Sequence, residues 1–111
     1  MLLVIDVGNT HTVLGVYEGE NLLHHWRVWT DQQKTSDEYG ILIRNLYDGS
    51  HLSSREVDAI IVSSVVPPLT PTIVELCSRY FGITPLSFGL SILMEIPVFT
   101  PGPTTRGVMP K

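Results

Sequence analysis

The stretch "LLVIDVGNTHTVLGVYEGENLLHHWRVWT", residues 2–30, carries the clearest structural pattern in the chain. Apolar and β-branched residues gather there in runs separated by turn residues, which predicts strands at residues 2–7, 12–17 and 22–30. The connections between these runs are too short for the crossover that parallel neighbours need. The three strands are therefore expected to form an antiparallel meander.

After residue 35 the spacing of apolar residues lengthens from two to three or four. Residues 36–49 open with Ser36 and two acidic residues, which suits a helix N-terminus, and Gly49 supplies a C-terminal stop. The expected buried positions recur at helical spacing: Tyr39, Leu42, Ile43 and Leu46. We predict an amphipathic helix over these residues.

The second half of the chain alternates strand and helix patterns. Residues 57–68 are typical of a second buried strand that runs into a proline-containing loop. A helix is predicted next, with Thr70 as N-cap, Pro71 as its first helical residue and Gly82 as its stop. Its apolar face carries Ile73, Val74, Leu76, Cys77 and Tyr80. A short strand at 84–88 completes an α/β domain of order βββαβαβ, in which parallel strands with crossover helices continue the meander.

The character of the sequence changes near residue 90. Residues 91–111, "SILMEIPVFTPGPTTRGVMPK", hold four of the eight prolines and show no helical period. We expect residues 1–90 to form one domain and the chain from about residue 95 to be an extended or disordered tail.

Composition restricts the classes of function. The 111 residues carry a net charge of −4 and no run of Lys or Arg, which gives no electrostatic basis for binding nucleic acid or an anionic membrane surface. The first apolar run is interrupted by Asp6 and is too short for a signal peptide or a membrane span. Cys77 is the only cysteine, so no intramolecular disulfide is possible. We predict a soluble, cytoplasmic protein.

A carboxylate, Asp6, stands at the end of the first strand. A buried charge is costly unless it is paired, so Asp6 is expected to face out of the sheet's edge, where a hydrated Mg²⁺ carried by a phosphorylated substrate would suit it. Gly8 permits close backbone approach, and Asn9 and Thr10 offer donors in a turn whose N–H groups can bind an anion. A plain hairpin turn capped by the Asp6 side chain is the alternative. Residue spacing leaves both interpretations open.

Three stretches, in this order, resemble the motifs of type III pantothenate kinases, relatives of acetate and sugar kinases, actin and the heat-shock chaperone ATPases. They are "IDVGNTHTVLGVY" (5–17), "WRVWTDQQKTSDEYG" (26–40) and "IIVSSVVPPLT" (60–70). The resemblance implies a duplicated ribonuclease-H-like (actin-like ATPase) fold with ATP bound between the two copies. It also implies transfer of the γ-phosphoryl group of ATP to pantothenate in coenzyme A biosynthesis, with Mg²⁺, a monovalent cation (K⁺ or NH₄⁺) and a homodimer.

The resemblance also assigns roles to residues of the first motif. Asp6 would hold the Mg²⁺ and the phosphates, directly or through water, and Asn9 and Thr10 would donate hydrogen bonds to phosphate oxygens. The cofactor-binding residues implied in this way are Asp6, Val7, Gly8, Asn9, Thr10, His11, Thr12 and Val13. This assignment favours the phosphate-binding interpretation of the turn.

The general base of the family, the Asp of a Gly-x-Asp-Arg motif, has no counterpart here, since no Asp follows Asp58. The resemblance is expected to stop near residue 90, so that residues 91–111 form a divergent tail, and the family's second domain is also absent from these 111 residues. We therefore assign no catalytic residue and expect a truncated form without turnover of its own. The alternative is a non-catalytic ribonuclease-H-like module that binds nucleotide weakly or contacts another protein.

Other polar residues have structural interpretations. The acidic pair Asp37 and Glu38 suits the N-terminus of a helix through the helix dipole. Ser63 and Ser64 either line the cleft or satisfy the backbone where their strand ends. The histidines are too scattered to form a metal site, and Cys77 is expected to be an inert core residue.

Overall fold

The computed structural model describes residues 1–88, and the structure is reported for these residues. The strands are β1 (Leu2–Val7), β2 (His11–Glu18), β3 (Asn21–Trp29), β4 (Ala59–Ser64) and β5 (Leu86–Phe88), and the helices are α1 (Ser36–Gly49) and α2 (Thr70–Phe81). Short 3₁₀ turns lie at Ser54–Glu56 and Pro67–Leu69. The predicted order βββαβαβ is confirmed. The predicted tail lies outside the described residues.

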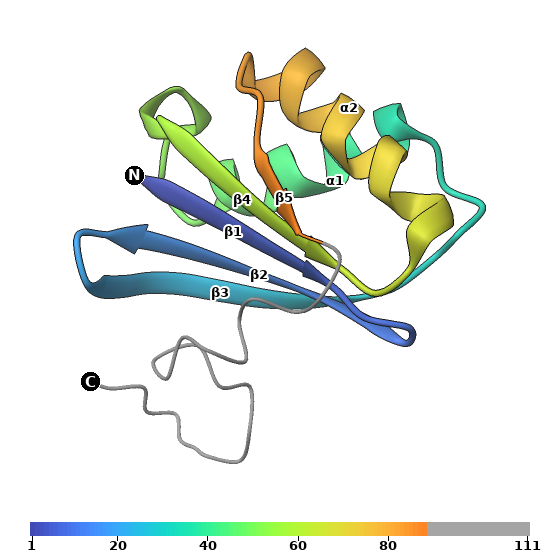
Figure 1. Ribbon diagram of the computed structural model, residues 1–111. Coiled ribbons are helices and arrows are strands. Elements are labelled where there is room, and N and C mark those ends of the chain that lie inside the picture. The colour runs from blue at the N-terminus through green and yellow to red at the C-terminus, as the bar shows by residue number, and fades with distance from the viewer. Residues whose placement is uncertain (89–111) are drawn as a thin grey trace.

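The strands form one mixed sheet in the order β3-β2-β1-β4-β5. Strand β2 pairs antiparallel with both β1 and β3, whereas β4 pairs parallel with both β1 and β5. Figure 1 shows α1 and α2 together over one face of this sheet. The predicted meander with parallel crossover units is therefore correct.

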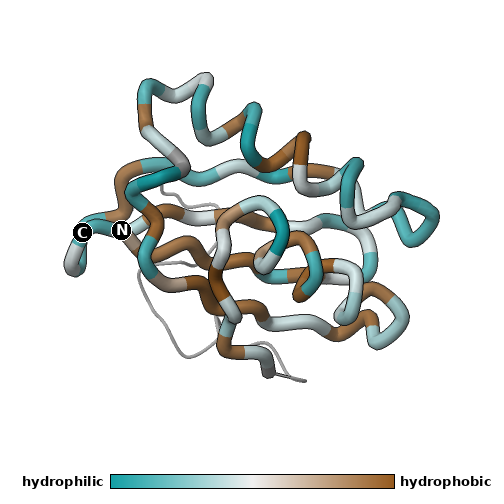
Figure 2. Tube along the Cα trace, turned by 90° about the horizontal axis from the view of Figure 1, so that it is seen from above, coloured by the Kyte–Doolittle hydropathy of each residue, from teal (hydrophilic) through white to brown (hydrophobic). Residues whose placement is uncertain are grey.

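The main hydrophobic core lies between the sheet and the two helices. Alternate residues of β1 point into it, because successive side chains of a strand face opposite sides of the sheet. Its other members include Leu14, Val16, Tyr39, Ile43, Tyr47, Ile60, Val62, Leu69, Ile73, Leu76 and Cys77. In Figure 2 hydrophobic residues recur among hydrophilic ones along the helices, as one-sided burial requires. Burial raises the pKa of the Cys77 thiol to about 12, which fits an inert core residue.

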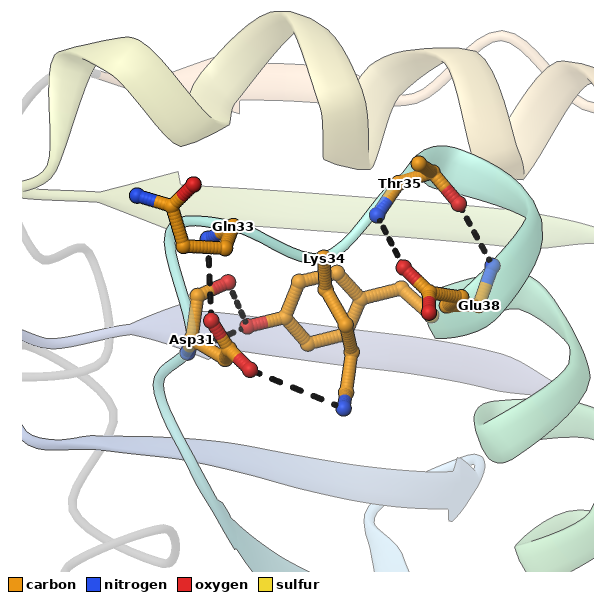
Figure 3. A network of polar contacts seen from close by, with 6 residues as sticks. Asp31, Gln33, Lys34, Thr35 and Glu38 are labelled. Carbon is orange, nitrogen blue, oxygen red and sulfur yellow. Dashed lines mark hydrogen bonds and ion pairs between the residues drawn. The ribbon is translucent and has the colours of Figure 1, made fainter.

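Helix α1 begins with a capping box, drawn in Figure 3. The Thr35 hydroxyl accepts from the Glu38 N–H at 3.1 Å, and the Glu38 carboxylate accepts from the Thr35 N–H at 2.8 Å. Ser36 is therefore the first helical residue, and Thr35 is the N-cap. Gly49 ends the helix as predicted, but the left-handed backbone conformation that follows belongs to His51, with φ 65°. Glu38 has the structural role expected for an acidic residue at this position.

The prediction that Thr70 is the N-cap of the second helix was wrong. The 3₁₀ turn of residues 67–69 leads directly into α2, so Leu69 occupies the cap position and Thr70 already has helical dihedral angles. The Thr70 hydroxyl instead donates back to the Val66 carbonyl at 3.4 Å. At the other end Gly82 adopts φ 68°, which confirms its predicted role as the helix stop.

The two helices contact each other at Gly40 of α1 and Tyr80 of α2. A Cβ atom on Gly40 would lie 2.4 Å from Tyr80 Cδ1, so the ring occupies the space that any other residue would need. The Tyr80 hydroxyl donates to Asp37 Oδ1 at 2.7 Å, and Arg79 Nη1 lies 3.4 Å from the same oxygen. Asp37 therefore holds the helix pair together, which is a structural role.

Candidate functional site

Asp6 lies on the face of the sheet that the helices leave uncovered. Leu3, Ile5 and Val7 pack into the core beneath the helices, so the alternation of β1 turns Val4 and Asp6 to the opposite face. Val4 is fully buried there, and Asp6 is half-buried. The carboxylate thus stands near the carboxyl end of β1, beside the hairpin that leads to β2 (Figure 1).

The strand register places chemically active side chains in one row with Asp6. Asp6 is opposite Val13 on β2 and beside Ser63 on β4, and Val13 is in turn opposite Arg27 on β3. Neighbouring strands are about 4.8 Å apart, so Asp6 and Arg27 are separated by about 10 Å across one row. A carboxylate, a hydroxyl and an exposed guanidinium therefore share this face.

Sequence reasoning did not assign Arg27 to the site, and it left two interpretations for Ser63, which either lines the cleft or satisfies the backbone. Both occur in the motifs that resemble the kinase family, but their position beside Asp6 depends on strand register. Arg27 is far from Asp6 in the sequence and reaches its row only because two hairpins place β3 beside β2 and β2 beside β1. The only available signal was the presence of these residues in the second and third motifs.

The hairpin between β1 and β2 is tight at Gly8. The Gly8 N–H donates to the His11 carbonyl at 3.0 Å. A Cβ atom at Gly8 would lie 2.9 Å from that same carbonyl oxygen, so the close approach of the two backbone segments requires glycine. The next two residues, Asn9 and Thr10, are exposed at the tip. Their polar side chains are thus accessible to a ligand.

The predicted site residues divide between the two faces of the sheet. His11 and Val13 belong to the helix-free face with Asp6, because Val13 is opposite Asp6 and His11 precedes it by two residues. Val7 and Thr12 are buried on the helix side. The side chains of Val7 and Thr12 are therefore turned away from Asp6, and any contribution they make to a ligand comes from their backbone.

An aromatic pair borders the hairpin on the helix-free side. His11 is opposite Trp29, and their ring centroids are 4.7 Å apart. Trp29 is 71% exposed, which makes it the most exposed of the large hydrophobic residues in residues 1–88. The two rings lie beside the exposed tip of the turn.

The third motif brings the end of β4 against the end of β1. The Val65 N–H donates to the Val7 carbonyl at 3.0 Å, and the Ser64 hydroxyl both accepts from the Val66 N–H at 3.1 Å and donates to the Val66 carbonyl at 3.2 Å. Ser64 therefore satisfies backbone groups where its strand ends, whereas Ser63 lies in the row of Asp6. The carboxyl ends of these parallel strands meet at one edge of the sheet, where α/β proteins commonly bind ligands.

The donor set fits a magnesium ion that arrives with phosphates. Within residues 1–88, His, Cys, Asp and Glu side chains nowhere gather in a group of three or more that could hold a metal ion by themselves. Mg²⁺ is commonly bound by one or two carboxylates together with substrate phosphates and water. The half-buried carboxylate of Asp6 suits that kind of binding, whereas Ser63 beside it in the sheet is fully buried.

Comparison with known proteins shows which family the chain belongs to. A sequence model of the type III pantothenate kinase family matches residues 2–108. The chain belongs to the type III pantothenate kinase family. The match extends beyond residue 90, where we expected the resemblance to stop, so the family also includes part of the segment that we regarded as divergent.

Curated members of the family are close in sequence. A type III pantothenate kinase from an Exiguobacterium species is 45% identical over 107 residues, covering 96% of this chain and 42% of that protein. One from Halalkalibacterium halodurans is 51% identical over 92 residues, covering 83% of this chain and 36% of that protein. The chain thus spans less than half the length of these relatives.

Solved structures of sugar kinases share the fold. A protein described as an N-acetylglucosamine kinase from Porphyromonas gingivalis superposes with a TM-score of 0.60 at 14% identity, over 80% of this chain and 34% of that one. The ROK hexokinase of Thermus thermophilus gives 0.56 at 14% identity, over 78% and 34%. The fold is ribonuclease-H-like, as predicted.

Neither of the helices described in residues 1–88 has the length and hydrophobicity needed to cross a bilayer.

Proposed function

We propose that residues 1–88 form the phosphate-binding half of the active site of an ATP-dependent pantothenate kinase. The observation that carries this proposal is the position of Asp6, at the carboxyl end of a central strand, on the helix-free face and beside the exposed tip of a tight hairpin. Membership in the type III pantothenate kinase family supports it, since the relatives bear that name.

In this proposal the residues of the site position phosphates and balance charge. Asn9 and Thr10 at the tip donate hydrogen bonds to phosphate oxygens, and Arg27, in the row of Asp6, attracts the same negative charge. Asp6 is the residue that would hold Mg²⁺, which when bound neutralises charge on the phosphate oxygens. Phosphoryl transfer depends on such positioning more than on covalent chemistry by the protein.

The remaining features of the proposal come from the family resemblance. They are a monovalent cation, a homodimer, a cytoplasmic location and pantothenate as the acceptor. We propose further that residues 1–90 are one domain and that the acceptor's general base and the second half of the nucleotide site are supplied by parts of the family fold beyond it. The 111 residues alone are then a nucleotide-binding unit without turnover.

A chimeric enzyme tests this function directly. Residues 1–88 replace the aligned part of the full-length Exiguobacterium relative, which is 45% identical to this chain. We expect the chimera to phosphorylate pantothenate with ATP, because the grafted part supplies the phosphate site and the host supplies the rest. The measurement is a coupled assay of ADP formation with and without pantothenate.

Two controls make the result interpretable. The 111-residue chain alone is expected to show no pantothenate-dependent ADP formation, and the chimera carrying Asp6→Asn is expected to lose at least about a thousandfold in turnover. A chimera that folds, as judged by circular dichroism, but has no activity would contradict the kinase function and favour a non-catalytic module.

A further inference from the structure

Thr30, the residue after β3, contacts the hairpin between β1 and β2 through both its side chain and its backbone. Its hydroxyl donates to the Gly8 carbonyl at 2.7 Å, and its N–H donates to the Thr10 carbonyl at 2.8 Å. Its Oγ1 also lies 2.9 Å from Thr12 Oγ1. The Thr30 hydroxyl proton is used on Gly8, so the Thr12 hydroxyl is the donor in that second contact. Thr30 thus fixes the carbonyl groups on both sides of Asn9.

These contacts determine where the Asn9 N–H points. The described peptide bonds are all trans, and in a planar trans peptide the C=O and N–H groups point in opposite directions. Because the Gly8 carbonyl is turned toward the Thr30 hydroxyl, the N–H of Asn9 is turned away from it. Thr12 and its partner Thr30 lie on the helix side of the sheet. The Asn9 N–H is therefore directed away from Thr30.

Thr30 is itself held in place from the first helix. The next residue, Asp31, donates its N–H to the Tyr39 hydroxyl at 2.7 Å, and that hydroxyl donates to the Asp31 carbonyl at 2.9 Å. Tyr39 belongs to α1 and is 1% exposed, and burial is the main cause that raises its pKa. The Asp31 carboxylate accepts from the Gln33 N–H at 2.9 Å and lies 3.8 Å from Lys34 Nζ (Figure 3). A continuous set of contacts thus joins α1 to the hairpin.

We propose that Thr30 is a positioning residue for the triphosphate of a nucleotide. By fixing the Gly8 and Thr10 carbonyls it holds the turn, and with it the Asn9 N–H, in one conformation before the nucleotide arrives, so binding does not have to order the turn. This inference rests on the proposed function, because it assumes that the turn binds phosphate. A residue of the second motif (26–40) would thus determine the conformation of the turn in the first motif (5–17).

The test measures the affinity of the 111-residue chain for Mg-ATP by calorimetry in three variants. Thr30→Val removes the hydroxyl but keeps the branched shape and the backbone N–H, whereas Thr30→Ser keeps the hydroxyl. Thr70→Val is the matched control, since it removes a hydroxyl of α2 that donates to a backbone carbonyl, that of Val66. We expect Thr30→Val to weaken binding at least about tenfold, and Thr30→Ser and Thr70→Val to stay within about threefold of the parent chain.

A second readout separates positioning from general stability. The ¹⁵N shift of the Asn9 amide, which reports on the hydrogen bond to the Gly8 carbonyl, should change in Thr30→Val and be restored in Thr30→Ser.

If Thr30→Val does not fold, Tyr39→Phe takes its place: it releases Asp31 without touching the hairpin and should weaken Mg-ATP binding severalfold. Parent-like affinity in the folded variant, or a Thr30→Ser variant as weak as Thr30→Val, would overturn the inference. Absence of Mg-ATP binding by the parent chain would instead overturn the proposed function, and with it the role of Thr30 as a positioning residue.

Discussion

Asp6→Asn should remove most of the magnesium-dependent part of ATP binding by the 111-residue chain. The substitution keeps the size of the side chain and removes its negative charge, so the turn and the strand pairing are retained. Interactions that involve a charged partner contribute about 1.5 to 3 kcal/mol, which corresponds to about a ten- to hundredfold loss of Mg-ATP affinity. Binding of ATP in excess EDTA should change much less or improve, because the repulsion between carboxylate and phosphates is gone.

The comparison needs a control for charge alone. Glu20→Gln removes one negative charge from the exposed turn between β2 and β3, at the opposite end of β2 from the hairpin. This variant should bind Mg-ATP like the parent chain. The measurement is the ATP affinity of both variants, from calorimetric titrations with and without Mg²⁺ at equal ionic strength. Equal Mg-ATP affinity of Asp6→Asn and the parent would refute the assignment of the metal to Asp6.

Gly40→Ala should destabilise the domain by about 1 to 3 kcal/mol, the usual cost of overpacking. The added Cβ would lie 2.4 Å from Tyr80 Cδ1 and 2.8 Å from Cγ, the base of the ring, so the whole side chain has to move. That movement also breaks the hydrogen bond from Tyr80 to Asp37. The gain in helix propensity, up to about 1 kcal/mol for alanine over glycine, offsets only part of this cost.

A second glycine of the same helix provides the matched control. Gly49 has no atom within 4 Å of the position of an added Cβ, so Gly49→Ala adds propensity without a clash. It should therefore leave the free energy of unfolding unchanged or raise it by up to about 1 kcal/mol. Urea unfolding of both variants gives the two values. Gly40→Ala at least as stable as Gly49→Ala would show that the helix contact is not as tight as described.

The elements of this fold were largely predictable from the sequence. Residues 2–7 and 36–49 have the predicted bounds, because their apolar spacing is regular and their ends carry turn residues. The helix N-caps were less predictable. A cap depends on the backbone conformation of the preceding residues, and the 3₁₀ turn before α2 moved the cap from Thr70 to Leu69.

The site was predictable only in part. Asp6 and the turn after it could be found from the sequence, since a charge at the end of an apolar strand needs an explanation. The row that joins Asp6 to Ser63 and Arg27 depends on strand register, which local sequence does not determine. The contact of Thr30 with Gly8 spans 22 residues and involves a common residue type, so no local pattern could indicate it.

A titration of the ¹⁵N-labelled chain with Mg-ATP, followed by amide NMR, tests whether the turn after Asp6 binds phosphate. We expect the largest shifts on residues 6–13, with smaller ones at Arg27 and at Ser63, which share the row of Asp6. Residues 18–21, at the opposite end of β2, should not shift. Unchanged spectra at millimolar Mg-ATP, or shifts confined to residues outside the hairpin and its row, would contradict the phosphate-binding role of this site.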